Sequence, residues 1–179
     1  MRVLHAIAAA LMLVARGVSA EVADAAPGGF LVKHEVTVNA APDAVYKALI
    51  DIGSWWNPSH SYSGNAANMS IDARPGGCFW EKLPNGGGVE HMRIVFVAPG
   101  QMLRMSGALG PLQTSGLAGG MTWKLTAAPP ATRLELTYSV GGYMQGGADK
   151  MAGPVDGVLA EQLRRLKSFV ETGAPSAPK

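Results

Sequence analysis

Three side chains, Glu81, His91 and Arg93, have the types and the spacing that acid–base chemistry requires. A carboxylate beside an imidazole can pass a proton to or from a substrate near neutral pH. A guanidinium close by can stabilise the negative charge that develops on a substrate oxygen. Together these three residues would suit an enzyme that catalyses proton transfer on its substrate.

Two predicted strands, 78–83 and 89–97, position these side chains. They flank a Pro/Asn/Gly-rich segment that is typical of a β-hairpin turn, centred near Gly86. The facing pairs would be Glu81 with His91, Phe79 with Arg93, and Leu83 with Val89. Cross-strand charge pairs are also common on solvated faces, where each contributes less than about 1 kcal/mol. Catalysis, a polar contact inside a pocket and plain surface pairing therefore remain three alternatives for Glu81 and His91.

A loop rich in aromatic residues follows a predicted short helix over 42–50. Trp55 and Trp56 are adjacent, and His60 and Tyr62 come soon after. Binding sites are often built on such loops, although the tryptophans could instead plug one end of the core. The candidate ligand-binding side chains are mostly large and apolar: Trp55, Trp56, Tyr62, Phe79, His91, Met105, Trp123, Tyr138, Tyr143, Met151, Val155 and Leu159.

The segment from Met151 to Gly173 predicts one long helix. Apolar residues recur three and four positions apart along it, which lays one apolar stripe on an α-helix. Most of the chain before it alternates between apolar and polar residues, as half-buried strands do. The predicted strands are 30–38, 69–73, 78–83, 89–97, 102–106, 121–126 and 133–140. This order predicts an α+β fold in which a curved antiparallel sheet wraps around the C-terminal helix, with a cavity between them.

A long, glycine-rich connection is expected from Gly107 to Gly120. Loops of this length inside a compact domain are usually functional or mobile. Closing over the cavity as a lid is one role that such a loop could have.

The first twenty residues have the pattern of a secretory signal peptide. Arg2 precedes a short apolar run over 7–14, and small residues at Val18 and Ala20 fit a cleavage site after Ala20. We therefore expect a periplasmic or secreted protein with no membrane span once the signal is removed. Residues 21–29 are expected to be a flexible lead-in, 30–173 the single domain, and 174–179 a disordered tail.

Charge and composition narrow the choice of partners. The whole chain has 15 lysines and arginines against 13 acidic residues, and Arg2 and Arg16 would leave with the signal. The remaining chain has no basic stripe, so we expect no nucleic-acid partner. Cys78 is the only cysteine, and His34, His60 and His91 lack the spacing of metal ligands. We therefore expect no metal and no other cofactor.

Several short sequence segments resemble the SRPBCC or START-like superfamily, in particular its polyketide cyclase/dehydrase-like group. This group includes the heat-shock-chaperone-activator-type domains. The segments are the run 36–49, Trp55-Trp56, Arg74-Pro-Gly-Gly77, the run 97–104 and the strand 132–136 before the final helix. The resemblance implies a helix-grip fold with a deep, mostly apolar cavity under the C-terminal helix. It implies no catalytic residue, because the family shares none. An exported protein would also differ from the chaperone activators, which work inside cells.

Three classes of function follow from these observations. The first is an exported protein that binds a small apolar or aromatic molecule between the sheet and the C-terminal helix. The second, which the resemblance implies, is a cyclase-, dehydratase- or hydratase-like enzyme that acts on an apolar carbonyl compound with Glu81, His91 and Arg93. The third is an interaction module whose cavity is filled by its own side chains. The sequence leaves the ligand and the oligomeric state open.

Overall fold

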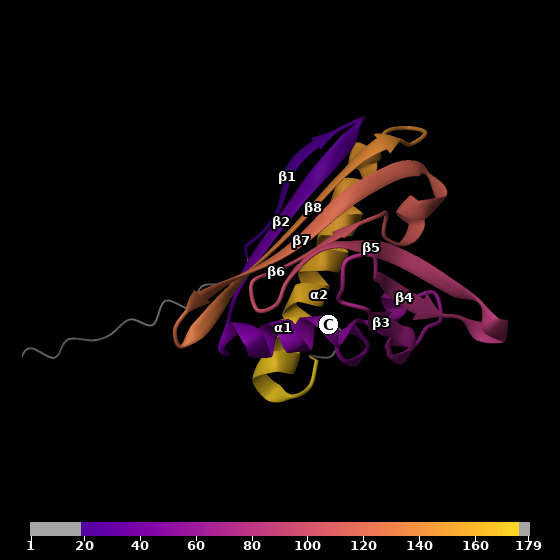
Figure 1. The fold of residues 1–179 in the computed structure, drawn as a ribbon. Helices are drawn as coiled ribbons and strands as arrows, with labels where there is room; N and C mark the ends of the chain where they lie inside the picture. Colours follow the sequence, from indigo (N-terminus) through magenta and orange to yellow (C-terminus); the bar gives the residue numbers. More distant parts are fainter. Residues whose placement is uncertain (1–18, 176–179) are drawn as a thin grey trace, which may run out of the picture.

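A computed structural model describes residues 19–175, and these form one eight-stranded antiparallel sheet with two α-helices (Figure 1). The strand order is β1-β2-β8-β7-β6-β5-β4-β3. The strands are β1 (Ser19–Ala26), β2 (Gly29–Val38), β3 (Met69–Ile71), β4 (Cys78–Lys82), β5 (Gly88–Ala98), β6 (Met102–Ser106), β7 (Gly116–Ala128) and β8 (Ala131–Tyr143). The helices are α1 (Pro42–Ile50) and α2 (Ala152–Thr172). The predicted α+β, helix-grip fold is confirmed.

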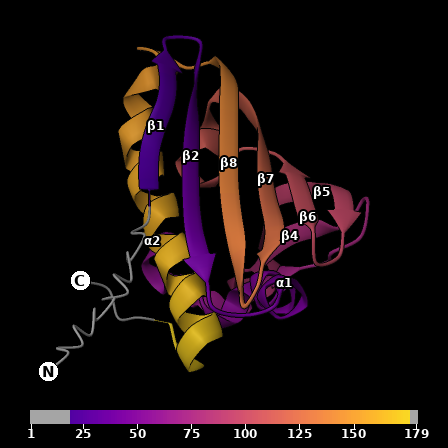
Figure 2. The ribbon, with the colours of Figure 1, turned by 90° about the vertical axis from the view of Figure 1, so that its left-hand side faces the viewer.

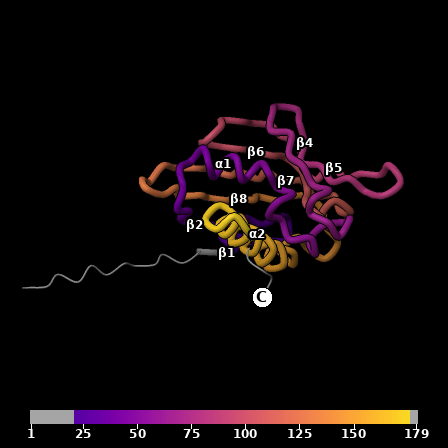
Figure 3. The backbone as a smooth tube through the Cα atoms, turned by 90° about the horizontal axis from the view of Figure 1, so that it is seen from below, coloured from indigo at the N-terminus to yellow at the C-terminus, as the bar shows by residue number. Residues whose placement is uncertain are grey.

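Helix α2 lies along the sheet and runs beside β1 and β2 for much of its length (Figure 2). The short helix α1 lies at one end of the molecule, close to the C-terminal part of α2 (Figures 1 and 3). Between α1 and β3 the chain makes three short 3₁₀ turns, of which Pro58–His60 borders the site described below. Both helices therefore pack against the sheet, α1 near β7 and β8 and α2 near β1 and β2.

The alternating pattern of β2 determines which of its side chains enter the core. Phe30, Val32, His34, Val36 and Val38 are all buried, whereas the residues between them are half-buried or exposed. Strand β8 pairs with the whole of β2 and buries every second residue of the paired stretch in the same way. Two adjacent strands thus offer one apolar face to α2, as period-two side chains require.

Helix α2 covers this face with its predicted apolar stripe. Leu159, Leu163 and Leu166 are buried against the sheet. The helix is capped by Gly173, which has a left-handed backbone conformation with a φ of 78°. A residue with a side chain would be strained in this conformation, whereas glycine is not. The boundaries predicted from the sequence, 151 and 173, differ from the observed ones by one residue at each end.

The prediction of a flexible lead-in over 21–29 is wrong for most of this segment. Residues Ser19–Ala26 form strand β1, which pairs antiparallel with β2. Without β1, the backbone groups of β2 on that side would be unpaired, so a neighbouring segment can add to the sheet whatever its composition. Val22 also packs against the core. Residues 1–18 of the expected signal peptide and 176–179 of the expected tail lie outside the described residues.

The expected loop from Gly107 to Gly120 is shorter than predicted. Strand β7 already begins at Gly116, and only 107–115, with a 3₁₀ turn at Gly110–Thr114, connects it to β6. A Cβ atom on Gly119 would lie only 2.7 Å from the ring of Tyr138, so glycine at this position makes room for the aromatic side chain. The hydroxyl of Tyr138 accepts a hydrogen bond from the Leu109 N–H and donates one to the Gly107 carbonyl, both 3.1 Å long. The connection is tied to the sheet at its start.

Candidate functional site

A pocket of about 350 Å³ lies beside the N-terminal half of α2. Its walls come from three places in the sequence: the aromatic loop after α1, the connection before β7, and α2 with the residue that precedes it. His91 of β5 completes the lining. Most of the surface is apolar, and the lining residues are Trp56, Ser59, His60, Ser61, Tyr62, His91, Leu109, Gly110, Pro111, Met151, Pro154, Val155, Val158 and Leu159.

Polar side chains on α2 hold the aromatic loop in place. The Oε1 atom of Gln162 accepts the Asn57 backbone N–H at 2.9 Å, and Glu161 accepts a 2.6 Å hydrogen bond from the Asn57 side chain. The Nε atom of Arg165 donates to the Trp55 carbonyl at 2.8 Å. Gln162, Asn57 and Arg165 are buried, so these contacts replace water for groups that would otherwise be costly to bury.

The two adjacent tryptophans have different roles because they point in different directions. Trp55 is fully buried, donates to the Ala48 carbonyl and packs edge-on against Trp123, so it belongs to the core. Trp56 lines the pocket and contacts the ring of Phe79. Its indole N–H donates to the His60 carbonyl at 2.9 Å and closes the loop on itself. One tryptophan therefore plugs the core while the other forms a wall of the pocket.

Glu81 and His91 meet inside the protein, although the predicted pairing is wrong. Glu81 pairs with Val89 rather than with His91, because the hairpin turn is centred on residue 85 instead of residue 86. Beyond that pair the register shifts between Phe79 and Trp80, which forms a β-bulge. This bulge makes His91 an extra residue in β5 and buries both His91 and Met92. The Nε2 atom of His91 lies 2.9 Å from Oε2 of Glu81, and their exposed fractions are 5% and 0%.

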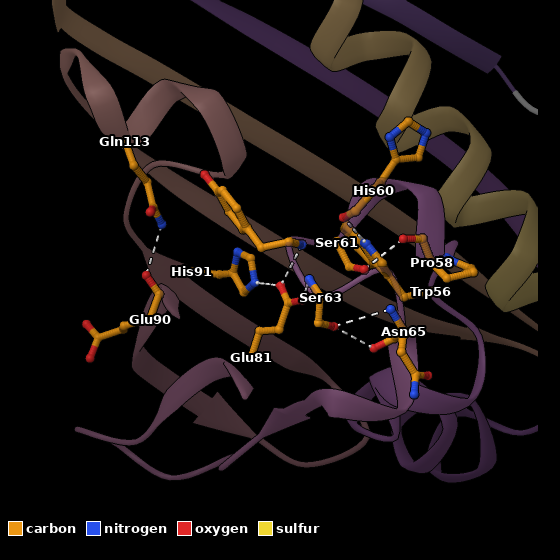
Figure 4. A network of polar contacts seen from close by, with 11 residues as sticks. Trp56, Pro58, His60, Ser61, Ser63, Asn65, Glu81, Glu90, His91 and Gln113 are labelled. Atoms are coloured by element: carbon orange, nitrogen blue, oxygen red, sulfur yellow. Dashed lines mark hydrogen bonds and ion pairs between the residues drawn. The ribbon is translucent and has the colours of Figure 1, made fainter. Parts of the chain in front are cut away.

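The Glu81 carboxylate also binds backbone N–H groups of the aromatic loop (Figure 4). Its two oxygens accept the Tyr62 N–H at 3.1 Å and the Ser63 N–H at 2.6 Å. Burial raises the pKa of the carboxyl, but the hydrogen bonds from Ser63, Tyr62 and His91 outweigh that effect, so the pKa lies below its usual value. Glu81 is therefore ionised at neutral pH.

The pKa of His91 is lowered from its usual value of 6.5 because burial disfavours the imidazolium, an effect that Glu81 only partly offsets. His91 is thus neutral at pH 7. Its ring lies against Phe79, with ring centroids 4.6 Å apart, and near Tyr62 at 6.0 Å. The arrangement is a neutral imidazole that is oriented by a charged carboxylate and packed between aromatic rings at the pocket wall.

Arg93 does not join this pair. The bulge turns it to the outer face of the sheet, where its side chain is largely exposed and forms an ion pair with Glu90 at 2.7 Å. Gln113 also reaches this region, donating to the Glu90 carbonyl (Figure 4). The predicted guanidinium beside a substrate oxygen is therefore wrong.

The remaining candidate residues divide into three groups. Trp56, Tyr62, His91, Met151, Val155 and Leu159 line the pocket. Trp55, Phe79, Met105, Trp123 and Tyr138 are buried in the core and do not line it. Tyr143 lies at the end of β8 with 76% of its surface exposed, so a role in this pocket is excluded.

Sequence reasoning missed several lining residues. Val158 belongs to the helical stripe and could have been found by extending it from Val155. Leu109 and Pro111 lie in the glycine-rich connection, where the sequence gives no periodicity to follow. His60 lines the pocket from the rim, and its Nε2 atom lies 3.2 Å from Glu161.

His34 takes no part in this site. It is buried on β2, and its Nε2 atom lies 3.1 Å from Asp156 of α2. Within residues 19–175, no group of three or more histidine, cysteine, aspartate or glutamate side chains is placed to hold a metal ion. No helix in the same part of the chain is long and apolar enough to cross a membrane.

Comparison with known proteins places the chain in a broad group. The sequence profile of the family described as polyketide cyclase / dehydrase and lipid transport matches residues 30–171. No curated protein matches the chain.

Several solved structures share the fold at low sequence identity. A conserved protein of unknown function, EF2215 from Enterococcus faecalis, has a TM-score of 0.59 and 16% identity over 90% of this chain and 82% of its own. CalU16 from Micromonospora echinospora has a TM-score of 0.60 and 16% identity over 88% of each chain. The Aha1 dimer from Colwellia psychrerythraea has a TM-score of 0.58 and 20% identity over 80% of this chain and 97% of its own. At these identities the similarity shows the fold alone.

The buried histidines predict that stability falls on acidification. Burial lowers the pKa of His91 and of His34 below 6.5; Glu81 opposes this for His91, while for His34 Asp156 opposes it and Arg164 adds to it. As the pH falls through 6.5, the unfolded chain takes up protons before the folded one, so the free energy of unfolding decreases. Urea unfolding between pH about 7.5 and about 5.5 measures this slope.

The variant His91→Gln isolates the contribution of His91 to this pH dependence of stability. Glutamine keeps an N–H donor for Glu81 but does not titrate, so we expect a shallower fall in the free energy of unfolding than in the wild type. An identical slope in the two proteins would contradict the lowered pKa of His91.

Proposed function

Because the chain belongs to the polyketide cyclase / dehydrase and lipid transport family, we propose that it binds a small apolar or aromatic molecule in the pocket beside α2. The observation that carries this proposal is the lining itself, in which Trp56, Leu109, Val155, Val158 and Leu159 surround a few polar atoms. Ligand pockets usually have this composition and span roughly 300–1,000 Å³. A volume of about 350 Å³ is at the small end of that range and favours a compact ligand.

An enzyme is the second candidate, and the Glu81–His91 pair is the observation in its favour. A neutral histidine held by a carboxylate at a pocket wall can act as a general base. The cyclase or dehydratase mechanism with Arg93 as the polarising group fails, because Arg93 lies on the outer face. The pocket also counts against a pure interaction module with a cavity filled by its own side chains.

The second part of the proposal concerns location. We propose that the protein acts in the periplasm or outside the cell, on the strength of the signal-like pattern in the first twenty residues. Cleavage after Ala20 would remove the pairs that Ser19 and Ala20 make with β2 and keep those from Glu21 onward. Most of strand β1 would therefore remain.

Filling the pocket should weaken ligand binding. Val158 lines the pocket, whereas Val170 is a half-buried valine further along the same helix and outside the pocket. We expect saturable binding of a neutral naphthalene-based fluorescent probe, weakened roughly tenfold or more in Val158→Trp and unchanged in Val170→Trp. Fluorescence titration measures the dissociation constants, and thermal unfolding checks that both variants are folded. Equal affinities in all three proteins would place binding elsewhere.

Export predicts a defined mature terminus. When the full chain is expressed in a Gram-negative host, the protein recovered from the periplasm or medium should begin at Glu21. N-terminal sequencing or intact mass measures this. Retention in the cytoplasm with residues 1–20 attached would contradict the proposed location.

A further inference from the structure

One nitrogen of the His91 ring is fixed by Glu81, and this determines the chemical nature of the other. Glu81 is ionised and can only accept hydrogen bonds, so the Nε2 atom of His91, 2.9 Å away, must carry the proton. Because the ring is neutral, Nδ1 then carries a lone pair and is an acceptor. The tautomer follows from the partner of Nε2 alone.

The acceptor Nδ1 is available to a molecule in the pocket. His91 is one of the lining residues, and Nδ1 makes no hydrogen bond to any residue from 19 to 175. Figure 4 shows one ring nitrogen of His91 on Glu81 and the other turned away from it. Contacts with Phe79 and Tyr62 hold the ring in this orientation.

An acceptor at an apolar wall discriminates between ligands by their polar groups. A ligand that offers an O–H group gains a hydrogen bond, while a hydrocarbon of the same shape leaves the acceptor unpaired at a cost. A carbonyl or ether oxygen has no proton to donate, so its lone pair would repel the lone pair of Nδ1. The other pocket histidine, His60, lies at a half-exposed rim, where water competes for its ring.

We infer that the pocket selects apolar molecules that carry a hydroxyl group, such as a phenol, an enol or an alcohol, whose O–H donates to Nδ1 of His91. This inference rests on the proposed function, since it requires a ligand in the pocket. It assigns Glu81 as a positioning residue: its carboxylate fixes the tautomer of His91 and does not itself line the pocket.

Two probes of nearly equal shape test the inference. 2-Naphthol carries the hydroxyl, and 2-methylnaphthalene replaces it with a methyl group. Calorimetric or fluorescence titration of the wild type should give a dissociation constant roughly tenfold lower for 2-naphthol. In His91→Phe, which keeps a ring beside Phe79 but has no acceptor, this preference should disappear while 2-methylnaphthalene still binds. Binding of 2-methylnaphthalene shows that the pocket of the variant is intact.

The outcomes separate this inference from the proposed function. Equal affinities for the two probes in the wild type would overturn the inference and leave apolar binding standing. A preference that persists in His91→Phe, or that is lost only in His60→Phe, would also overturn it. Failure to bind either probe would overturn both proposals.

A measurement on the wild type covers the case in which His91→Phe does not fold. Nitrogen NMR of ¹⁵N-histidine-labelled protein at neutral pH should show a protonated Nε2 and an unprotonated Nδ1 in His91. The Nδ1 resonance should move on addition of 2-naphthol and stay in place with 2-methylnaphthalene. A protonated Nδ1 in the free protein would overturn the inference.

Discussion

The site depends on hydrogen bonds from the buried side of α2 to the backbone of the aromatic loop. Gln162 and Arg165 lie among the leucines of the helix, yet they bond to Asn57 and to the Trp55 carbonyl rather than to solvent. Without these partners, each buried backbone group would cost about 1–3 kcal/mol. The loop therefore stays at a fixed distance from the helix, and Trp56, which is itself buried, forms a wall of the pocket.

Glu81 fixes the same loop from the opposite side. Its carboxylate accepts the backbone N–H groups of Tyr62 and Ser63 and also orients His91. One buried charge thus joins the hairpin, the loop and the only polar side chain that β5 contributes to the pocket. Buried charges are tolerated when hydrogen bonds compensate for the lost hydration, and here the hydrogen bonds outweigh the desolvation in setting the pKa. The hydrogen bonds of Glu81 therefore determine both the position of the loop and the ionised state of the carboxylate.

The sequence pattern predicted the helix and the strands well, because each pattern reflects which face of that element is buried. The alternation of β2 and the stripe of α2 each arise from one apolar face, and the long helix was placed to within a residue at either end. The pair Glu81 and His91 was found for a wrong reason, since the two are diagonal neighbours rather than a facing pair, and a bulge in β5 sends Arg93 outward. Three other features depend on partners that are distant in the chain, which a single sequence does not reveal. They are the bulge in β5, the pairing of β1 at the sheet edge, and buried polar residues such as Gln162.

The most direct test of the account is a crystal structure of the mature protein with 2-naphthol. The account predicts electron density for the ligand between Trp56, Val158 and Leu159, with its oxygen within hydrogen-bonding distance of Nδ1 of His91 and the loop unchanged. Ligand found only on the outer face of the sheet, or a pocket closed by its own side chains, would contradict it.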